Sequence, residues 1–556
     1  MKKIIIFLIC LQIISPVFAQ DKNFSAGQLE NEIKQNIQKA YAASVRIINL
    51  DRAGQKIGSY FSGVVIDAEG HILTAGHAIN PNSLYVVTFP DGREFKAKGL
   101  GVIHTIDAAM IVITDKGKWP VAKMGWSSLL EPNMPCLSIS YPGSLTATKP
   151  TIRLGYIAEL KYETGFMRTT CLMEPGDSGG PVFDLKGRVI GTHSRISFRT
   201  DVNLEVPVDN FRKYWTALTT PAIHTAFITE DKFKVDKKVE QVAPIQQMER
   251  LISSFETQDL AFRKDVFMVK DSMNASILST LVDLKGLVPE SNLKGKSFFV
   301  SKSSMIGSNP RVEMADGGMV SAKILSRDEA NDLVLLQIPQ EIEGGINLST
   351  IKIDYTFDKL GSILISPKPH AEGELSVLGN MQVKIPKSAA AYLGVGISFM
   401  TEDHTIVASG LYPLVSQKTT KPNDIAVMDV LKKINNRPIL TVEDVPDELS
   451  KYQTNDSVTF QYAKKSGALY TQSFILKRRS VRTSSQDDKF MDGVSLRRDD
   501  FKEVLVHDGQ LKPSECGGPL LDTKGNFYGI NIARLSRTSS LAIPAPMVVR
   551  FVKGIL

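Results

Sequence analysis

The sequence predicts a mainly β protein built from β-barrels, and three observations lead to this prediction. Residues 41–215 consist of short runs rich in β-branched and apolar residues, separated by turn sequences such as Asp91-Gly92 and Lys186-Gly187. The same pattern of runs and turns returns after residue 265. The chain has 556 residues, which is too long for one hydrophobic core. We therefore expect two related β units rather than one.

The first 19 residues have the composition of a signal peptide. Lys2 and Lys3 precede an apolar run at 4–14, and a small-residue cleavage site ends at Ala19. The apolar run is too short to span a bilayer, and no later run reaches 18 apolar residues. The sequence thus predicts an exported protein, periplasmic or secreted, without a membrane span. Removing the two lysines lowers the formal charge from +7 to +5, which indicates solubility and gives no case for a nucleic-acid partner.

The mature chain divides by pattern into a series of segments. Residues 20–40 are polar and helix-capable, and residues 41–218 carry the first set of β runs, at 45–48, 63–66, 84–89, 109–113 and 137–140. Residues 219–265 lose this rhythm and are expected to form a linker with one short helix near 245–254. The second β unit is expected to begin at residue 266.

A glycine-rich loop, Pro175-Gly176-Asp177-Ser178-Gly179-Gly180-Pro181, has the composition of a nucleophile loop. A serine hydroxyl needs an adjacent base, which is itself oriented by a third group. His77 and Asp107 lie upstream in an order that can supply both, and the N–H groups of Gly176 and Ser178 are candidates for an oxyanion hole. Alone, each motif is explained by a turn, a core histidine or a strand cap. Jointly and in this order they favour nucleophilic catalysis.

The first unit resembles a trypsin-fold serine protease of the HtrA-like bacterial group. The resemblance covers roughly residues 40–215 and rests on Thr74-Ala75-Gly76-His77, on Asp107 followed by an apolar strand, and on the loop at 175–181. It implies a chymotrypsin-like double β-barrel with the catalytic triad His77, Asp107 and Ser178 between two six-stranded barrels. It also implies an endopeptidase that cleaves unfolded or peptide substrates. HtrA-like relatives are often trimers, but no assembly element is identifiable in this sequence.

The second unit repeats the motifs of the first at altered spacing. Residues 297–305 align with 70–78, and residues 515–525 align with 177–187. The first two motif positions are 30 residues apart in the first copy and 28 in the second, but the next interval grows from 71 to 184 residues. About 113 additional residues, enough for a domain, must therefore lie between Pro386 and about Met491. We expect the second unit to comprise residues 266–386 and 480–556, interrupted by a domain at 387–479.

The second copy departs from the family at two of the three catalytic positions. Ser304 occupies the histidine position and Cys516 the serine position, whereas Asp332 remains. A cysteine with a nearby base can attack a carbonyl, but no histidine stands at the base position. We therefore interpret the second unit as a degenerate, structural double barrel in preference to a cysteine hydrolase.

The inserted segment resembles a PDZ domain of the HtrA type. Its Tyr392-Leu393-Gly394-Val395 is similar to the loop that binds a peptide carboxylate in these domains, and residues 408–411 and 429–439 resemble the segments that follow it. Met428 replaces the glycine that is usual before the aspartate. The resemblance implies that peptide C-termini bind here, through backbone N–H groups and an edge strand.

The remaining predictions concern specificity and the cysteines. By chain position, Leu172, Met173 and Ile196 are the candidates for the specificity pocket, and the absence of an acid at residue 172 argues against cleavage after Lys or Arg. Such a pocket favours small or medium apolar side chains. Cys136 and Cys171 fall in the same unit, and both a disulfide and two buried free thiols remain open.

No metal-binding motif is present, and no cofactor is expected. A different class of function also remains open, in which the protease unit is latent. The chain would then be a non-catalytic peptide-binding scaffold that uses the PDZ domain and the second barrel pair.

Overall fold

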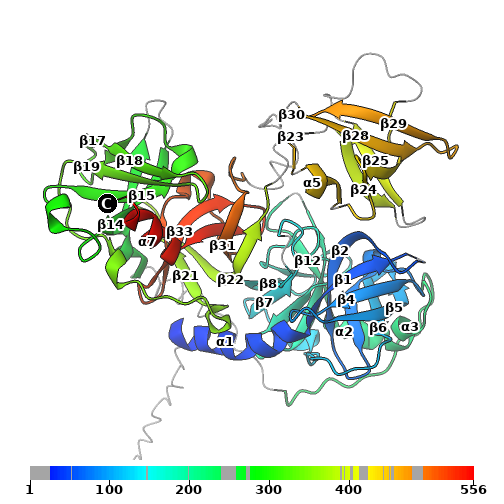
Figure 1. Cartoon of the computed structure of the whole chain (residues 1–556). Coiled ribbons are helices and arrows are strands. Elements are labelled where there is room, and N and C mark those ends of the chain that lie inside the picture. The colour runs from blue at the N-terminus through cyan, green and yellow to red at the C-terminus, as the bar shows by residue number, and fades with distance from the viewer. Residues whose placement is uncertain are drawn as a thin grey trace, which may run out of the picture.

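The computed structural model describes residues 26–51, 53–145, 148–197, 199–239, 258–270, 276–387, 391–392, 395–400, 405–411, 424–442, 444–449, 451–452, 456–478 and 493–555. The predicted signal peptide (1–19) lies outside the described residues. The fold is mainly β, as predicted, with two barrel-containing units side by side and a third β domain beside them (Figure 1). None of the described helices combines the length and apolarity that crossing a bilayer requires.

The first unit begins with a closed six-stranded barrel of order β1-β2-β3-β6-β5-β4. Its strands are β1 (Ser44–Leu50), β2 (Lys56–Val65), β3 (His71–Ala75), β4 (Leu84–Thr88), β5 (Glu94–Ile103) and β6 (Ala108–Ile113). Inward-facing apolar side chains fill this barrel, since Ile47, Val87 and Ile111 are all fully buried. The β3–β6 pair matters most for the site, because His77 follows β3 and Asp107 precedes β6.

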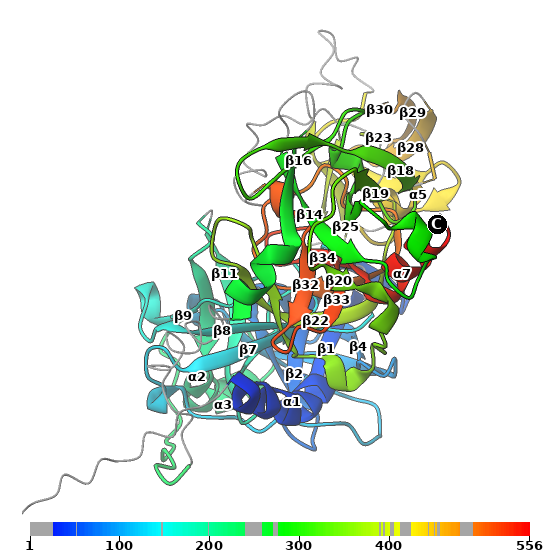
Figure 2. The same ribbon diagram turned by 90° about the vertical axis from the view of Figure 1, so that its left-hand side faces the viewer.

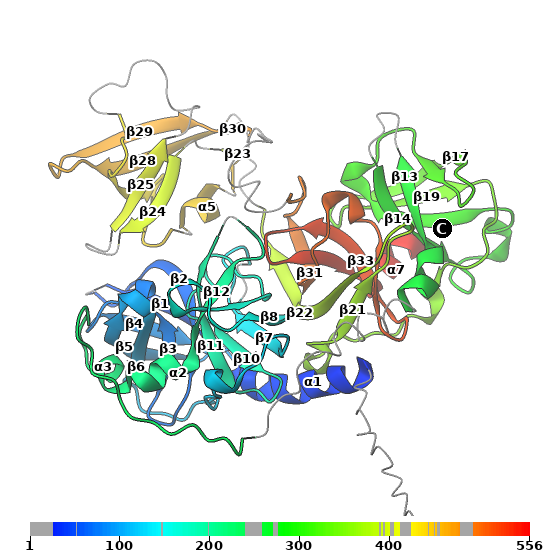
Figure 3. The same ribbon diagram turned by 180° about the vertical axis from the view of Figure 1, so that it is seen from behind.

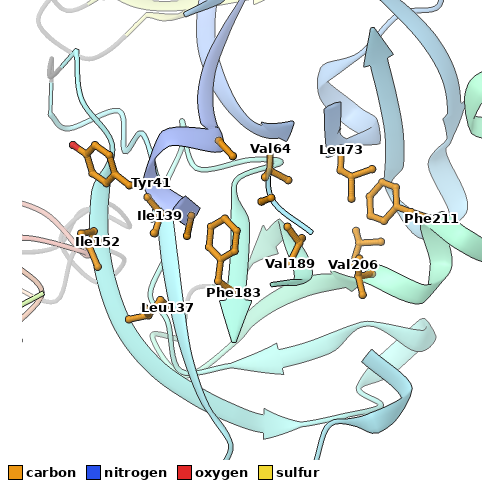
Figure 4. Packing of buried hydrophobic residues seen from close by; sticks show 14 of the residues in the cluster. Tyr41, Val64, Leu73, Leu137, Ile139, Ile152, Phe183, Val189, Val206 and Phe211 are labelled. Carbon is orange, nitrogen blue, oxygen red and sulfur yellow. The ribbon is translucent and has the colours of Figure 1, made fainter. Parts of the chain in front are cut away.

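The second barrel of this unit is also closed, with the order β10-β11-β12-β9-β8-β7. Its strands are β7 (Pro135–Ser140), β8 (Thr151–Glu159), β9 (Met167–Thr169), β10 (Pro181–Asp184), β11 (Val189–Ile196) and β12 (Asn203–Pro207), and two short helices follow, α2 (Val208–Lys213) and α3 (Trp215–Thr219). Side chains of both barrels meet in one apolar cluster that includes Val64, Leu73, Phe183 and Val206 (Figure 4). This shared core fixes one barrel against the other, and hence His77 and Asp107 against Ser178.

The second unit has the same two-part plan, but one part is an open sheet. An eight-stranded sheet contains β13 (Val266–Lys270), β14 (Ser276–Asp283), β15 (Ser297–Lys302), β16 (Arg311–Glu313), β17 (Met319–Ser321), β18 (Lys323–Asp328), β19 (Leu333–Ile338) and β20 (Ile346–Asn347). In the first unit the single strand β5 pairs with both β4 and β6 and so closes the barrel. In the second unit the corresponding strand is interrupted at Ala322. As a result, β17 pairs only with β16, and β18 pairs only with β19.

The other part of the second unit is a closed barrel of order β21-β22-β31-β34-β33-β32. Its elements are β21 (Ile363–Ser366), β22 (Glu374–Ile385), β31 (Phe501–His507), β32 (Pro519–Asp522), β33 (Phe527–Arg534), β34 (Ser540–Pro544) and the terminal helix α7 (Ala545–Lys553). The helix packs beside β33 and β34 (Figure 2). Between β22 and β31 the chain leaves this barrel, which is where the spacing predicts an insertion.

The inserted residues form a separate β domain above the first unit (Figures 1 and 3). Its sheet has the order β24-β25-β26-β28-β29 with β27 paired to β26, and a small sheet joins β23 to β30. The elements are β23 (Ala391–Tyr392), β24 (Val395–Met400), β25 (Thr405–Leu411), β26 (Val430–Ile434), β27 (Arg437–Pro438), α5 (Asp444–Leu449), β28 (Ser457–Ala463), β29 (Leu469–Ile475) and β30 (Lys477–Arg478). Within the predicted carboxylate-binding loop, Leu393 and Gly394 lie outside the described residues, and only backbone is described at Tyr392 and Val395.

The N-terminal helix α1 (Ala26–Ala43) connects the two units. It runs beneath both of them in Figure 1 and buries Ile33 and Ile37 in the same cluster as Leu360 and Ile363 of the second unit. Gly361 permits this contact, because a Cβ there would lie 2.3 Å from the Cδ1 atom of Ile37. The helix-capable segment predicted at 20–40 therefore extends to residue 43 and ties the units together.

The two units also contact each other directly through β8 and β22. Gly379 in β22 lies so close to β8 that an added Cβ would be 2.4 Å from the backbone oxygen of Ile152. Asn380 donates its amide to the backbone oxygen of Lys149 at 3.2 Å. Asp508 accepts hydrogen bonds from the N–H groups of Leu154 and Val377, one from each unit. The second unit therefore packs against the barrel that carries the nucleophile loop.

Candidate active site

The three residues predicted as a triad lie within hydrogen-bond distance of one another between the two barrels. The Nε2 atom of His77 is 3.0 Å from the Oγ atom of Ser178, and its Nδ1 atom is 3.0 Å from Oδ2 of Asp107. His77 lies in a single 3₁₀ turn directly after β3, and its side chain is half exposed. The imidazole therefore faces solvent on one side and a buried carboxylate on the other, which suits a group that shuttles a proton.

The carboxylate of Asp107 accepts hydrogen bonds from the backbone and from a second side chain, in addition to His77. The residue adopts a left-handed conformation with φ of 52°, and its Oδ1 atom accepts the backbone N–H of His77 at 2.8 Å. Its Oδ2 atom also accepts the hydroxyl of Ser194, a buried residue on β11. Burial by itself raises the pKa of Asp107. The hydrogen bonds and positive charge of His77, together with the hydrogen bond from Ser194, outweigh burial and hold the pKa below its usual value.

Ser194 is a site residue that sequence reasoning missed. It lies 87 residues from Asp107 in the chain and belongs to no recognisable motif. The packing of β11 against β3 brings its hydroxyl to the carboxylate. The preceding residue, His193, is fully buried, and its Nε2 atom lies 2.6 Å from the hydroxyl oxygen of Ser138. Its side chain therefore points into the barrel.

The loop before Ser178 contains the two backbone N–H groups that the sequence predicts as oxyanion donors. Gly176 has φ of 100°, which only glycine adopts readily, and a Cβ there would lie 2.6 Å from the backbone oxygen of Tyr141. The N–H of Gly143 donates to the backbone oxygen of Pro175 at 2.7 Å, which fixes the peptide group that carries the Gly176 N–H. Within the described chain, the N–H groups of Gly176 and Ser178 donate to no protein acceptor. Both are therefore available to a ligand oxygen.

A buried ion pair connects the nucleophile loop to strand β8. Arg153, on β8, donates to both carboxylate oxygens of Asp177 at 2.8 and 3.0 Å, and the two side chains are 1% and 0% exposed. Asp177 also accepts the hydroxyl of Ser140 and the backbone N–H of Glu174. Arg153 also donates to the backbone oxygen of Leu172 at 2.9 Å. One guanidinium thus fixes the residue before the nucleophile and the start of the predicted pocket segment.

The candidate pocket residues come from two segments, one before the nucleophile loop and one at the end of β11. Leu172 and Ile196 are half-buried, and Met173 is buried. The N–H of Met173 donates to the side-chain oxygen of Asn203, which pairs with Ile196 across β11 and β12. The segments before the nucleophile and after β11 are therefore joined by a direct hydrogen bond. The specificity pocket at Leu172, Met173 and Ile196 stays a prediction.

Cys136 and Cys171 are free, buried thiols whose sulfur atoms are 3.7 Å apart. Of the two alternatives left open by the sequence, the structure has the unpaired one. Burial, followed by the neighbouring Cys171, raises the pKa of Cys136 well above its ordinary value. The pair lies in the core of the second barrel, and it contributes packing rather than an accessible nucleophile.

The second unit repeats part of this arrangement around Asp332, with other residues at the histidine and serine positions. Asp332 has φ of 58° and accepts the backbone N–H of Ser304 at 2.7 Å, as Asp107 accepts that of His77. The ammonium group of Lys302 occupies the space beside this carboxylate, 2.6 Å from Oδ2. Cys516 is fully buried, and burial raises its pKa. A buried, protonated thiol without an adjacent histidine is a poor nucleophile.

The comparisons with known proteins agree with this geometry. Residues 61–191 match the family of trypsin-like peptidase domains. The chain is 32% identical over 167 residues to the serine protease HhoA of Synechocystis, 33% over 165 residues to a DegP-like periplasmic serine endoprotease of Pseudomonas fluorescens, and 29% over 160 residues to the serine protease HTRA1 of Xenopus laevis. These matches use 28% of the chain and cover 42%, 34% and 35% of the three relatives.

The chain therefore spans less than half the length of these relatives, and the family match at residues 61–191 falls in the first unit. The family match, the two closed barrels and the position of the candidate site between them point to the same class. The first unit of this chain is similar to trypsin-like peptidase domains, and in particular to serine proteases of the HtrA-like kind.

Proposed function

We propose that this protein is an exported serine endopeptidase that cleaves unfolded or peptide substrates through an acyl-enzyme. The observation that carries the proposal is the hydrogen-bonded series from Asp107 through His77 to Ser178, next to two unused backbone N–H groups. The relatives named as serine proteases support the same reaction class. The apolar leader, together with relatives named as periplasmic, supports export.

In this mechanism Ser178 attacks the scissile carbonyl while His77 accepts its proton at Nε2. Asp107 keeps the imidazole in the tautomer that presents Nε2 and stabilises the imidazolium that forms. The N–H groups of Gly176 and Ser178 stabilise the oxyanion, and each such donor contributes about 2.7–4 kcal/mol to lowering the barrier. His77 then returns the proton to the leaving amine, and water hydrolyses the acyl-enzyme by the reverse sequence.

The second part of the proposal concerns recognition. A pocket formed with Leu172, Met173 and Ile196 accepts small or medium apolar side chains, since no carboxylate stands at residue 172. A cleavage profile dominated by basic residues would contradict this. The inserted domain, which resembles a PDZ module, reads peptide C-termini through the loop at 392–395. Binding of a free-carboxylate peptide but not of its amidated form tests this function.

The decisive experiment compares the mature wild-type protein with its Ser178→Ala variant on casein and with a fluorophosphonate probe. We expect wild-type protein to degrade casein and to be labelled, and the variant to lose both, with a fall in kcat of roughly 10⁶-fold. A Cys516→Ala variant is the matched control and should keep wild-type activity. Absence of both hydrolysis and labelling in the wild type would favour the alternative, a latent peptide-binding scaffold.

A further inference from the structure

The turn between β33 and β34 in the second unit is polar, yet it is completely buried. We call residues 535–539 the β33–β34 turn. Ser536, Arg537, Thr538 and Ser539 are each at most 1% exposed. Burying a charged or hydroxyl side chain is costly unless it is hydrogen-bonded. The partners of these side chains therefore account for the position of the turn, and both Arg537 and Thr538 bond residues of the first unit.

Arg537 binds the loop that follows β11 of the first unit. Its Nη1 atom donates to the backbone oxygen of Ser197 at 3.0 Å, and Nη2 donates to those of Arg199 and Thr200 at 2.9 and 3.1 Å. Nη2 also lies 3.3 Å from the side-chain oxygen of Asn203. A single guanidinium thus binds three carbonyl groups of the loop that directly follows the candidate pocket residue Ile196, and the side-chain amide at the start of β12.

Thr538 binds the segment that precedes the candidate oxyanion loop. Its hydroxyl donates to Oε2 of Glu174 at 2.9 Å, and Oε1 of Glu174 accepts the backbone N–H of Ser144 at 2.8 Å. The backbone N–H of Glu174 in turn donates to Asp177. The carboxylate of Glu174, which is 7% exposed, therefore joins the second unit to two loops that surround Gly176.

We propose that the β33–β34 turn is a built-in activating element, in which Arg537 and Thr538 are positioning residues for the active site of the first unit. This inference rests on the proposed function and deepens it. The loops at 172–177 and after β11 take part of their hydrogen bonds from the second unit, and ordering such loops costs conformational entropy at each residue. Contacts from the second unit fix both loops before substrate arrives, which preorganises the pocket and the oxyanion hole.

In this role the second unit positions the loops of the first unit and needs no catalytic triad of its own. Its barrel presents a rigid turn, and the interface at β8 and β22 together with α1 holds that turn against the protease unit. Displacing the second unit would release Glu174 and the loop after β11 at the same time. The activity of the first unit is thus coupled to how the second unit packs against it.

The test uses Thr538→Val and Arg537→Met in the full-length mature protein. Valine keeps the shape of threonine but leaves Oε2 of Glu174 without its donor, and we expect kcat and the rate of fluorophosphonate labelling to fall about 10- to 100-fold. Thr538→Ser restores the hydroxyl and should recover activity to within twofold. Arg537→Met should raise KM as well, because it frees the pocket loop. Arg550→Met, at an exposed arginine of α7, is its matched control.

Two further measurements separate a positioning role from a general loss of stability. Hydrogen exchange should increase in the peptides that contain 172–177 and 199–203 in both variants, while β1–β6 remain protected. In a Glu174→Gln background, Thr538→Val should lower kcat by less than twofold, because its effect passes through Glu174.

The outcomes distinguish this inference from the proposed function. Wild-type protein that neither hydrolyses nor is labelled would refute the proposed function, and hydrogen exchange would still report whether the turn holds the loops. Wild-type activity that persists unchanged in both variants, with unchanged exchange, would overturn the inference and leave the proposed function standing.

Discussion

Replacement of Arg153 by methionine should lower kcat although the three triad residues remain unchanged. The variant removes both hydrogen bonds to Asp177 and the one to the backbone oxygen of Leu172, while it leaves His77, Asp107 and Ser178 unchanged. Methionine fills a similar space without charge. The Asp177 carboxylate would keep the hydroxyl of Ser140 and the N–H of Glu174 as donors. It would lose the one cation that pairs with it among the described residues, in a site that is 0% exposed.

The size of the effect follows from the burial of the pair. Removing one partner of a buried ion pair costs about 3–5 kcal/mol, because an uncompensated charge remains. The loop can escape that cost by moving the carboxylate of Asp177 towards solvent, but this movement turns the adjacent Gly176 peptide away from the oxyanion position. The loss of that donor lowers kcat by about 10²–10³-fold. We therefore expect a large fall in kcat with a smaller change in KM.

The assay is hydrolysis of a fluorogenic peptide together with the rate of fluorophosphonate labelling and the thermal unfolding midpoint. Arg153→Lys keeps the charge but loses the paired geometry, and it should lie between wild type and Arg153→Met. Adding Asp177→Asn to Arg153→Met removes the stranded charge and should recover part of the stability. A kcat for Arg153→Met within threefold of wild type, at an unchanged midpoint, would refute the reasoning.

Three further predictions concern other groups. Ser194→Ala should lower kcat/KM about 10- to 100-fold, since Asp107 loses a charge-assisted hydrogen bond; an unchanged kcat/KM would show that Asp107 needs no such support. Desolvation at the unit interface raises the pKa of Asp508 to about 6, so the folded protein binds a proton more tightly there than the unfolded chain, and stability should fall by at most about 3 kcal/mol as the pH rises from 4 to 7. Asp508→Asn should remove this fall in pH-dependent thermal unfolding. Cys516 should resist iodoacetamide until the protein unfolds, because burial raises the pKa of its thiol, and rapid labelling of the native protein would contradict this.

The sequence predicted the parts of the fold that depend on local pattern. Short apolar runs and turn residues predicted a mainly β chain, and the structure confirms it with closed barrels in both units. The repeat and its altered spacing predicted an interruption of the second copy, and the chain leaves the barrel between β22 and β31. The interruption at Ala322, which separates β17 from β18 and leaves one sheet open, was not predictable from the sequence. It depends on the strand with which each of the two segments pairs.

Within the candidate site, the sequence determined the residues that carry recognisable motifs, namely His77, Asp107 and the loop around Ser178. What only the tertiary structure decided is which side chains hold them in place. Ser194 lies 87 residues from Asp107, and Thr538 lies 364 residues from Glu174. Such contacts follow no spacing rule, because strand pairing and the packing of one unit on another bring them together. The candidate catalytic residues were therefore predictable from local sequence. The side chains that position them depend on contacts that exist only once both units have folded.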